Sequence, residues 1–481
     1  MKTDPVTASP ESQGIPSKAI KNMIEALEKN EIPMHSLLIA RNQKLVLSAY
    51  YAPFGPGELH RMFSISKSFV SLAIGMLEQE GLISLDDPIA VYFPEYIPKN
   101  CDPRILSMTI REMLMMQTCH SSTTYKLHPN KNWVKSFFDT PPTHPSGTVF
   151  LYDTSSSHTL CALVEKLKKM PVLDYLKNCF LREIGFSEHS FFLKDPFGTS
   201  MGGSGLMAEP MDLLKLGLLL QNHGYASDGR SLIPELYLEK ACSFQVCTMH
   251  TAPTQEESKG YGYQFWMLQH GGYACYGMGG QLLIVLPEEN LVCVTTADTQ
   301  EMKGTNQFIY NALYDCILPE LSSTPLPESP KAQTRLKQKL STLSLPILSG
   351  ALQTDCPAFC PDHIYKIKEH NTAFKKFFLT FSSDYSEGKL HYYNNGPWHV
   401  LPFGLGTLKE SFFPVYHQRC VSCAVWSRPD TLYIKCQLIG EFVGTLHFQF
   451  CFLDEKVFVY MKKTEETLFN EFQGFLIGES I

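Results

Sequence analysis

The chain has 481 residues, of which 44% are hydrophobic and 19% are charged, so global disorder and a single small stapled module are excluded. Its 41 Lys and Arg residues against 48 Asp and Glu residues give a formal net charge of -7. Nucleic-acid binding normally requires a basic surface, so we expect no nucleic-acid partner.

In chain order, the hydrophobic pattern first predicts a helix and a hairpin, over 20–27, 36–40 and 45–51. A helix is expected to begin near Ser64 and to end near Gly81. A mostly helical stretch follows, with helices expected over 110–116, 159–170, 172–180 and 211–221. Aromatic and β-branched residues then predict strands over 261–268, 281–286 and 291–297, before a helix over 304–318.

Two domains are expected, over 1–320 and 351–481. The segment 321–350 is rich in Pro, Ser and Thr and is expected to be a linker, in which 332–340 can form a short helix. The second domain is predicted to be all-β, from strands such as 423–426, 431–438, 444–452 and 456–462.

The cysteines and the apolar segments bear on localisation. The 15 cysteines are scattered from Cys101 to Cys451, which favours reduced thiols over a disulfide framework. The first residues carry no apolar run typical of a secretory signal, and no later stretch has the roughly 18 apolar residues of a membrane span. We therefore expect a cytoplasmic protein with no membrane partner, while the sequence predicts no particular oligomeric state.

The strongest local signal for chemistry is the pair Ser64 and Lys67. Residues three apart share one face of a helix, so the Lys67 amine can reach the Ser64 hydroxyl. A hydroxyl is a poor nucleophile unless a base removes its proton, and lysine can be that base only when its pKa falls from about 10.4 toward neutrality. Burial and the positive end of a helix dipole both disfavour the ammonium form.

The spacing Ser-x-x-Lys is weak evidence by itself. The chain contains a second match, Ser386 and Lys389, in a predicted turn. The alternative interpretation of the first match is a helix N-cap at Ser64 with a solvated Lys67.

Longer sequence blocks strengthen the first match. They lie in one order along the chain: Pro10–Ile15, His35–Ser36, His60–Phe69, Glu80–Pro88, Phe93–Tyr96 and Thr109–Leu114. Over about residues 8–318 these blocks resemble the serine β-lactamase-like hydrolases, which include class C β-lactamases, esterases and 6-aminohexanoate-dimer hydrolases. The resemblance implies an α+β, β-lactamase/transpeptidase-like fold, with an antiparallel sheet flanked by helices and a helical lobe, here followed by the smaller all-β domain.

The resemblance also implies roles for residues. Ser64 matches the acylated nucleophile and Lys67 its proton-transfer partner. Tyr152, in Tyr152-Asp153-Thr154, matches the second motif, where a phenol with its pKa lowered by the nearby ammonium relays protons. Thr154 replaces the more usual Asn, which argues against β-lactam recognition.

The third motif of that family matches Met278-Gly279-Gly280, with Met278 at the usual cationic position. Glycines there let a substrate approach the backbone, and the N–H of Gly280 or Gln281 is expected to form an oxyanion hole together with that of Ser64. Met278 cannot bind a carboxylate, so we expect a less polar pocket.

No metal and no cofactor are expected. Cys420 and Cys423 would face opposite sides of a strand, and the histidines show no tight ligand spacing: His120, His128, His144 and His158. The sequence therefore predicts a serine hydrolase that cleaves a small ester, amide or peptide substrate through an acyl-serine. The alternatives are a non-catalytic or merely acylable binding protein on the same scaffold, and a protein whose functional part is the β domain.

Overall fold

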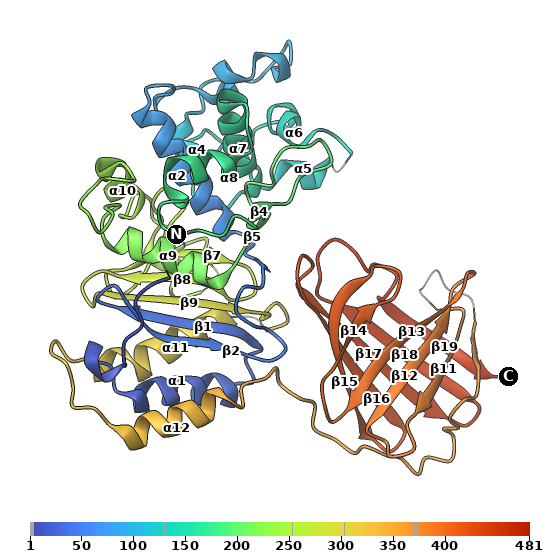
Figure 1. Ribbon diagram of the computed structural model, residues 1–481. Helices are drawn as coiled ribbons and strands as arrows, with labels where there is room; N and C mark the ends of the chain where they lie inside the picture. The colour runs from blue at the N-terminus through green and yellow to red at the C-terminus, as the bar shows by residue number, and fades with distance from the viewer. Residues whose placement is uncertain (1–3, 129, 253, 303, 369–373) are drawn as a thin grey trace. The chain divides into compact units, whose positions relative to one another are not determined.

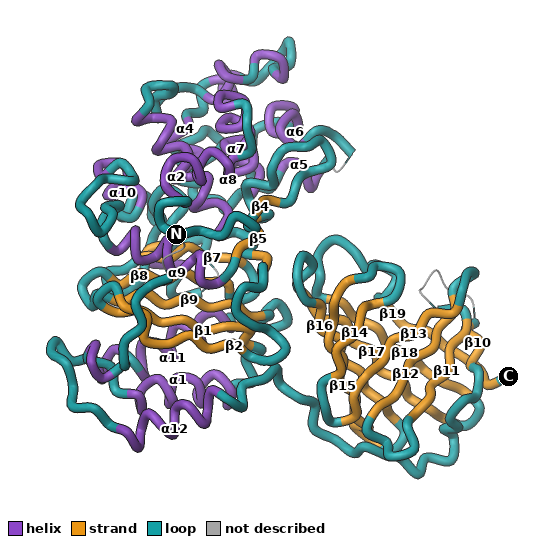
Figure 2. Tube along the Cα trace, in the orientation of Figure 1, coloured by secondary structure: helices purple, strands orange, loops and turns teal. Residues whose placement is uncertain are grey.

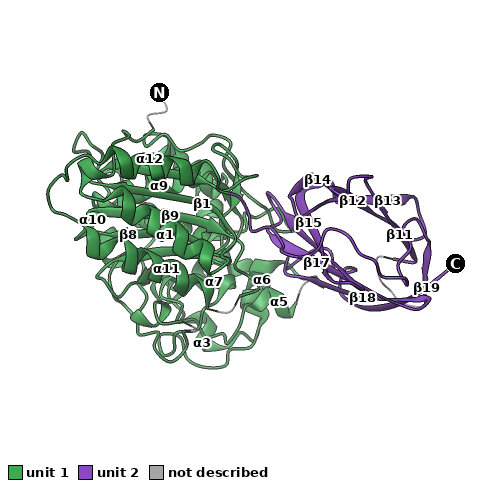
Figure 3. Cartoon of the chain, turned by 90° about the horizontal axis from the view of Figure 1, so that it is seen from below, with its two compact units in different colours: residues 1–343 green, residues 344–481 purple. Residues whose placement is uncertain are grey.

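The computed structural model describes residues 4–128, 130–252, 254–302, 304–368 and 374–481 (Figures 1 and 2). The chain forms two compact units, Met1–Leu343 and Ser344–Ile481 (Figure 3). Within the described ranges, no helix combines the length and the apolar character needed to cross a membrane.

A six-stranded antiparallel sheet lies at the centre of the first unit, in the order β2-β1-β9-β8-β7-β6. The strands are β1 (Met34–Arg41), β2 (Lys44–Tyr50), β6 (Trp266–Met267), β7 (Tyr273–Gly277), β8 (Gln281–Leu286) and β9 (Leu291–Ala297). Strands β1, β8 and β9 are buried along their whole length. Helices therefore cover both faces of this sheet (Figure 1).

One face of the sheet carries α1 (Ser17–Lys29), α11 (Thr305–Cys316) and α12 (Pro330–Leu340) (Figure 1). The buried side of α1 follows from apolar residues at helical spacing. Helix α12 lies in the segment expected to be a linker, and its Leu336 packs into the same core as α1.

The other face carries α2 (Ile65–Gln79) and α9 (Pro210–Gln221), with the helical lobe beyond them (Figures 1 and 2). The remaining helices of the unit are α3 (Pro103–Leu106), α4 (Ile110–Leu114), α5 (Thr124–Leu127), α6 (Trp133–Asp139), α7 (Thr154–Lys168), α8 (Val172–Leu176) and α10 (Glu235–Ala241). Short 3-10 helices are Glu11–Gln13, Ile89–Tyr92, Pro94–Tyr96, Glu257–Lys259 and Leu318–Glu320. A small sheet in the order β3-β5-β4 consists of β3 (His60–Arg61), β4 (Phe191–Phe192) and β5 (Leu206–Ala208).

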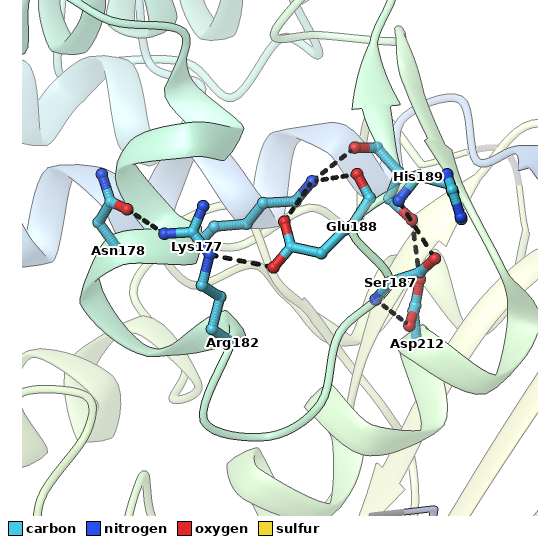
Figure 4. Close-up of polar contacts among 8 residues, drawn as sticks. Lys177, Asn178, Arg182, Ser187, Glu188, His189 and Asp212 are labelled. Carbon is cyan, nitrogen blue, oxygen red and sulfur yellow. Dashed lines mark hydrogen bonds and ion pairs between the residues drawn. The ribbon is translucent and has the colours of Figure 1, made fainter. Parts of the chain in front are cut away.

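Buried polar side chains fix the connection between the lobe and α9 (Figure 4). After α8 the chain forms a π-helical turn, Lys177–Leu181. The Lys177 amine donates to the carbonyls of Glu188 and Ser190, each at 2.9 Å. Asp212 in the first turn of α9 accepts hydrogen bonds from the Ser187 N–H and the Ser190 hydroxyl, each at 2.8 Å.

The second unit is a β-barrel. Its ten strands are hydrogen-bonded in the order β13-β12-β11-β10-β19-β18-β17-β16-β15-β14, and a parallel pairing of β13 with β15 closes it. They are β10 (Tyr365–Ile367), β11 (Lys376–Phe381), β12 (Glu387–Tyr393), β13 (Trp398–Leu405), β14 (Lys409–Phe413), β15 (Gln418–Arg428), β16 (Thr431–Leu438), β17 (Gly444–Leu453), β18 (Lys456–Lys463) and β19 (Gly474–Ser480). Exposed and buried residues alternate along β12 and β18, as expected of strands with one face toward a core.

Most predicted elements are confirmed, including the helix that follows Ser64, the strands over 281–286 and 291–297, and an all-β second unit. The strand expected over 261–268 is wrong for most of its length, because strand pairing in β6 is confined to Trp266–Met267. Gln264 adopts a left-handed φ of 64°, which is incompatible with extended backbone. Strand β7 was not predicted.

Candidate active site

Ser64 lies at the amino end of α2, at the N-cap position. Phe63 before it has a φ of 45°, an unfavourable left-handed conformation for a bulky residue. The Ser66 hydroxyl donates to the Phe63 carbonyl at 2.6 Å and accepts from the Leu206 N–H at 2.9 Å. The turn that presents Ser64 is thereby tied to β5, and Ser64 remains partly accessible.

Lys67 extends from the first turn of α2 back to Ser64. Its Nζ is 2.8 Å from the Ser64 Oγ and 2.6 Å from the Gly203 carbonyl oxygen, and only 1% of the residue is exposed. Ser64 makes no side-chain capping hydrogen bond. The alternative of a capping Ser64 with a solvated Lys67 is therefore wrong for this structure. The distance from Nζ to Oγ is suitable for direct proton transfer.

At position 203, any residue larger than glycine would force its surroundings to move. A Cβ at this residue would lie 2.3 Å from the Thr154 Cγ2 and 2.9 Å from the Thr154 carbonyl oxygen. Thr154 is the first residue of α7, so the Gly203 carbonyl that binds Lys67 is packed directly against the start of that helix.

We expect Gly203→Ala to displace this carbonyl and with it the Lys67 amine. A misplacement of about 1 Å at a reacting group can cost about 100-fold in rate, so we expect Ser64 to react about 10- to 100-fold more slowly with a fluorophosphonate, a reagent whose reaction measures the activity of a serine nucleophile. Gly55→Ala is the control, because the nearest atom to its added Cβ is the Glu58 Oε1 at 4.0 Å. Equal rates of this reaction in the two variants would show that the Gly203 carbonyl does not position Lys67.

Tyr152 lies against the same amine. The Lys67 Nζ is 4.8 Å from the centre of the Tyr152 ring. The ring stacks on Trp266 at a centroid distance of 5.6 Å and meets Tyr261 edge-on at 6.4 Å. These aromatic contacts hold Tyr152 beside Ser64 and Lys67, so the structure brings together the three residues that the sequence singled out.

The expected lowering of the Tyr152 pKa is not what the structure gives. Burial raises the pKa of this phenol well above its usual value, the charge of Glu257 raises it further, and a hydrogen bond to Ser64 opposes the rise. Although 36% of the residue's surface is exposed, its hydroxyl end is densely surrounded. Tyr152 is therefore a neutral phenol at physiological pH, suited to donate a proton.

The third motif forms the turn between β7 and β8. Gly277 at the end of β7 touches the segment before Ser64, because a Cβ there would lie 2.3 Å from the Met62 carbonyl oxygen. Met278 and Gly279 line a pocket of about 180 Å³ together with Tyr276. Other residues around this pocket include Glu257, Thr299 and Asn306.

The predicted oxyanion and substrate residues differ in what they contact. Gly279 and Gly280 have φ values of 84° and 92°, which glycine tolerates best. The Gln281 side chain is bound to the Met278 carbonyl at 2.7 Å and to the Ala297 carbonyl at 3.0 Å. The Gln281 amide group is therefore not available to a substrate, and the residue as a whole is buried.

Sequence reasoning did not assign roles to three residues of this site, Gly203, Glu257 and Asp153. Gly203 lies in the Gly-rich segment Gly202–Leu206, which resembles a Gly-rich segment of the family and was expected to border the cleft, but no pattern there assigns its carbonyl to Lys67. Glu257 lies far from Ser64 in the chain and carries no motif, so its position depends on the tertiary fold. Asp153 was visible as the middle of Tyr152-Asp153-Thr154, and its acidic side chain before a helix is a signal for an N-cap. In the described ranges, no group of three or more His, Cys, Asp or Glu side chains is arranged to hold a metal ion.

Comparison with known proteins places this chain in a family. A family model described as Beta-lactamase matches residues 20–313. The 6-aminohexanoate-dimer hydrolase of Paenarthrobacter ureafaciens is 22% identical over 315 residues, which cover 61% of this chain and 80% of that protein. Protein flp of Staphylococcus aureus (strain COL) is 24% identical over 180 residues, which cover 34% of this chain and 36% of that protein. The match thus spans about a third of the length of flp.

Among solved structures, a "putative beta-lactamase" from Bacteroides dorei DSM 17855 aligns with a TM-score of 0.51 and 14% sequence identity, covering 62% of this chain and 96% of that one. At this identity the likeness concerns the fold alone, and it agrees with the predicted α+β arrangement of antiparallel sheet, flanking helices and helical lobe. Because the family model extends over more than half of the residues, the chain belongs to the Beta-lactamase family.

Proposed function

We propose that this protein is a serine hydrolase that cleaves an ester or amide bond of a small substrate through an acyl-serine intermediate. The observation that carries the proposal is the buried Lys67 amine, 2.8 Å from the hydroxyl of Ser64, a residue that is only partly buried. An amine at this distance can accept the hydroxyl proton when it is neutral, which makes the oxygen a nucleophile.

In acylation, the Ser64 Oγ attacks the substrate carbonyl carbon while its proton passes to the Lys67 Nζ. The carbonyl oxygen becomes an oxyanion, which the N–H of Ser64 and a backbone N–H of the Gly280–Gln281 segment stabilise. The positive end of the α2 dipole favours the same negative charge.

Tyr152 is proposed to complete the proton transfer. Burial keeps the pKa of its phenol high, so it holds a proton that it can give to the leaving alcohol or amine as the carbon–oxygen or carbon–nitrogen bond breaks. Lys67 then returns the Ser64 proton to Tyr152. Water then attacks the carbonyl carbon of the acyl-serine while Lys67 accepts a proton from the water. The bond between this carbon and the Ser64 Oγ breaks, the acid leaves, and Lys67 returns a proton to the Ser64 Oγ.

The proposal is tested by treating the pure protein with a fluorophosphonate and locating the adduct by mass spectrometry. Turnover is measured with p-nitrophenyl esters, short D-amino-acid peptides and nitrocefin. We expect an adduct on Ser64 and turnover of an ester or peptide. Labelling of Ser64 without turnover of any compound would favour the acylable binding protein instead, and a failure of Ser64 to react would contradict both.

Met278 provides a prediction about substrate charge. Met278→Lys introduces a cation into the 180 Å³ pocket, where the family usually has one. We expect the kcat/KM for nitrocefin, which carries a carboxylate, to rise at least about tenfold relative to that for p-nitrophenyl acetate, since one charge-assisted hydrogen bond contributes roughly 1.5–3 kcal/mol. The control is Met249→Lys, at a residue that is 63% exposed. An unchanged ratio would show that this pocket does not contact the substrate.

A further inference from the structure

Asp153 is a buried carboxylate that the mechanism above does not use. It is 0% exposed and lies at the N-cap of α7, directly after Tyr152. Its Oδ1 accepts hydrogen bonds from the Ser155 N–H at 2.8 Å and the Ser155 hydroxyl at 2.5 Å. Its Oδ2 is buried and, in the described part of the chain, has no hydrogen-bond partner.

Capping the helix does not explain a charge at this position. One oxygen is enough for the cap, and Asn or Ser would cap α7 about as well without burying a carboxylate. A buried charge without compensation is strongly unfavourable. The second oxygen of Asp153 and its negative charge therefore require another explanation.

The Lys67 amine is an opposite charge that acts on Asp153. The Gly203 carbonyl, which accepts from Lys67, is packed against Thr154, the residue after Asp153, and the amine lies over the ring of Tyr152, the residue before it. Burial raises the pKa of Asp153 to about 6, while the hydrogen bonds from Ser155 and the charge of Lys67 lower it. An electrostatic interaction acts equally on both partners, so the Asp153 carboxylate must in turn stabilise the Lys67 ammonium.

Other titratable groups do not offer the same compensation. Cys119, from the segment after α4, interacts with Asp153, but burial raises the pKa of its thiol to about 12 and it stays neutral. Tyr152 is also neutral, as described above. Lys67, in contrast, is a cation whose charge lowers the pKa of Asp153.

We propose that Asp153 is a positioning residue that acts through Lys67: its carboxylate stabilises the ammonium form and so sets the pH at which the amine becomes a base for Ser64. This inference rests on the proposed function. Asp153, the middle residue of Tyr152-Asp153-Thr154, would thus determine the pH range in which Ser64 can be acylated.

The test compares Asp153→Asn with the wild type in the pH dependence of fluorophosphonate labelling of Ser64. Asn keeps the acceptor for Ser155 but removes the negative charge that stabilises the Lys67 ammonium. The acidic limb of the pH profile, where labelling slows because Lys67 is protonated, should therefore move about one pH unit or more to lower pH. At a pH on that limb, labelling should be about tenfold faster than in the wild type. Asp212→Asn is the matched control. Asp212 is also a buried carboxylate in the first turn of a helix, but both of its oxygens have partners (Figure 4). This variant should leave the limb in place.

A second readout does not depend on any reaction. Carbon NMR of protein labelled at the lysine Cε, with the Lys67 signal assigned through Lys67→Met, reports the titration of the amine directly, and its midpoint should fall in Asp153→Asn. If Asp153→Asn does not fold, Asp153→Ser replaces it. A folded variant with an unmoved midpoint, or with labelling slowed equally at every pH, would overturn the inference. If wild-type Ser64 is not labelled, the proposed function fails while the NMR titration still decides the role of Asp153.

Discussion

Ser64→Ala is expected to lower ester or amide cleavage by about 1000-fold or more and to abolish labelling by a fluorophosphonate. The substitution removes the attacking oxygen and leaves Lys67, Tyr152 and the backbone donors in place. Any residual rate would come from binding and oxyanion stabilisation alone. The measurements are kcat/KM with the best p-nitrophenyl ester and mass spectrometry of the labelled protein.

The fold should tolerate this change, which makes the result easy to interpret. The Ser64 side chain makes no capping hydrogen bond, so Ala deprives α2 of no cap. The loss of the contact with Lys67 is expected to cost about 1 kcal/mol in the free energy of unfolding, measured by denaturant titration. An active Ser64→Ala variant would remove the basis for the proposed chemistry.

Ser386→Ala is the matched control, because Ser386 and Lys389 have the same spacing in the sequence. In the structure the Ser386 hydroxyl donates to Asp384 at 2.8 Å and is exposed. We expect this variant to keep full activity and full labelling. The two matches share a spacing but differ in their surroundings, because Lys67 is buried beside Ser64 whereas the Ser386 hydroxyl is exposed and bound to Asp384.

Features that depend on neighbouring residues in the chain could be predicted from the sequence, whereas contacts between distant segments could not. Helix α2 was predictable because its apolar residues recur at helical spacing, and the contact between Ser64 and Lys67 is local to one turn. The Gly203 carbonyl is 136 residues away from Lys67, and no local pattern signals that contact. Long-range contacts of this kind depend on how α7 packs against α2.

The error at Tyr152 has a similar cause. Sequence reasoning considered the ammonium of Lys67, which lowers the pKa of a nearby phenol. It could not include the burial of the hydroxyl, which dominates and raises the pKa, or the smaller effect of the Glu257 charge, because both come from distant segments. The strand expected over 261–268 is wrong for most of its length because its aromatic side chains are buried in two different cores: Tyr261 packs in the cluster of Trp266, while Tyr263 and Phe265 pack in the core on the side of the helical lobe, and strand pairing is confined to Trp266–Met267.

Lys67→Met should separate the role of the amine from that of the buried side-chain volume. Met occupies a similar space but can neither accept nor donate the proton, and a general base typically contributes about 100- to 10,000-fold in rate. We expect a fall of at least about 1000-fold in the rate of Ser64 labelling, because the amine is also the group that orients the hydroxyl. Thermal unfolding of the variant shows whether it remains folded.

Lys67→Met is expected to have two opposing effects on the free energy of unfolding. Lys67 is buried, so its replacement removes the cost of burying a cation, but it leaves the Gly203 carbonyl without this donor and the Asp153 carboxylate without its counter-charge. The double variant with Lys67→Met and Asp153→Asn should therefore be more stable than Lys67→Met alone, while remaining as inactive. If the second substitution does not restore stability, the two charges do not compensate each other. If Lys67→Met alone keeps its rate of labelling, another base must serve Ser64.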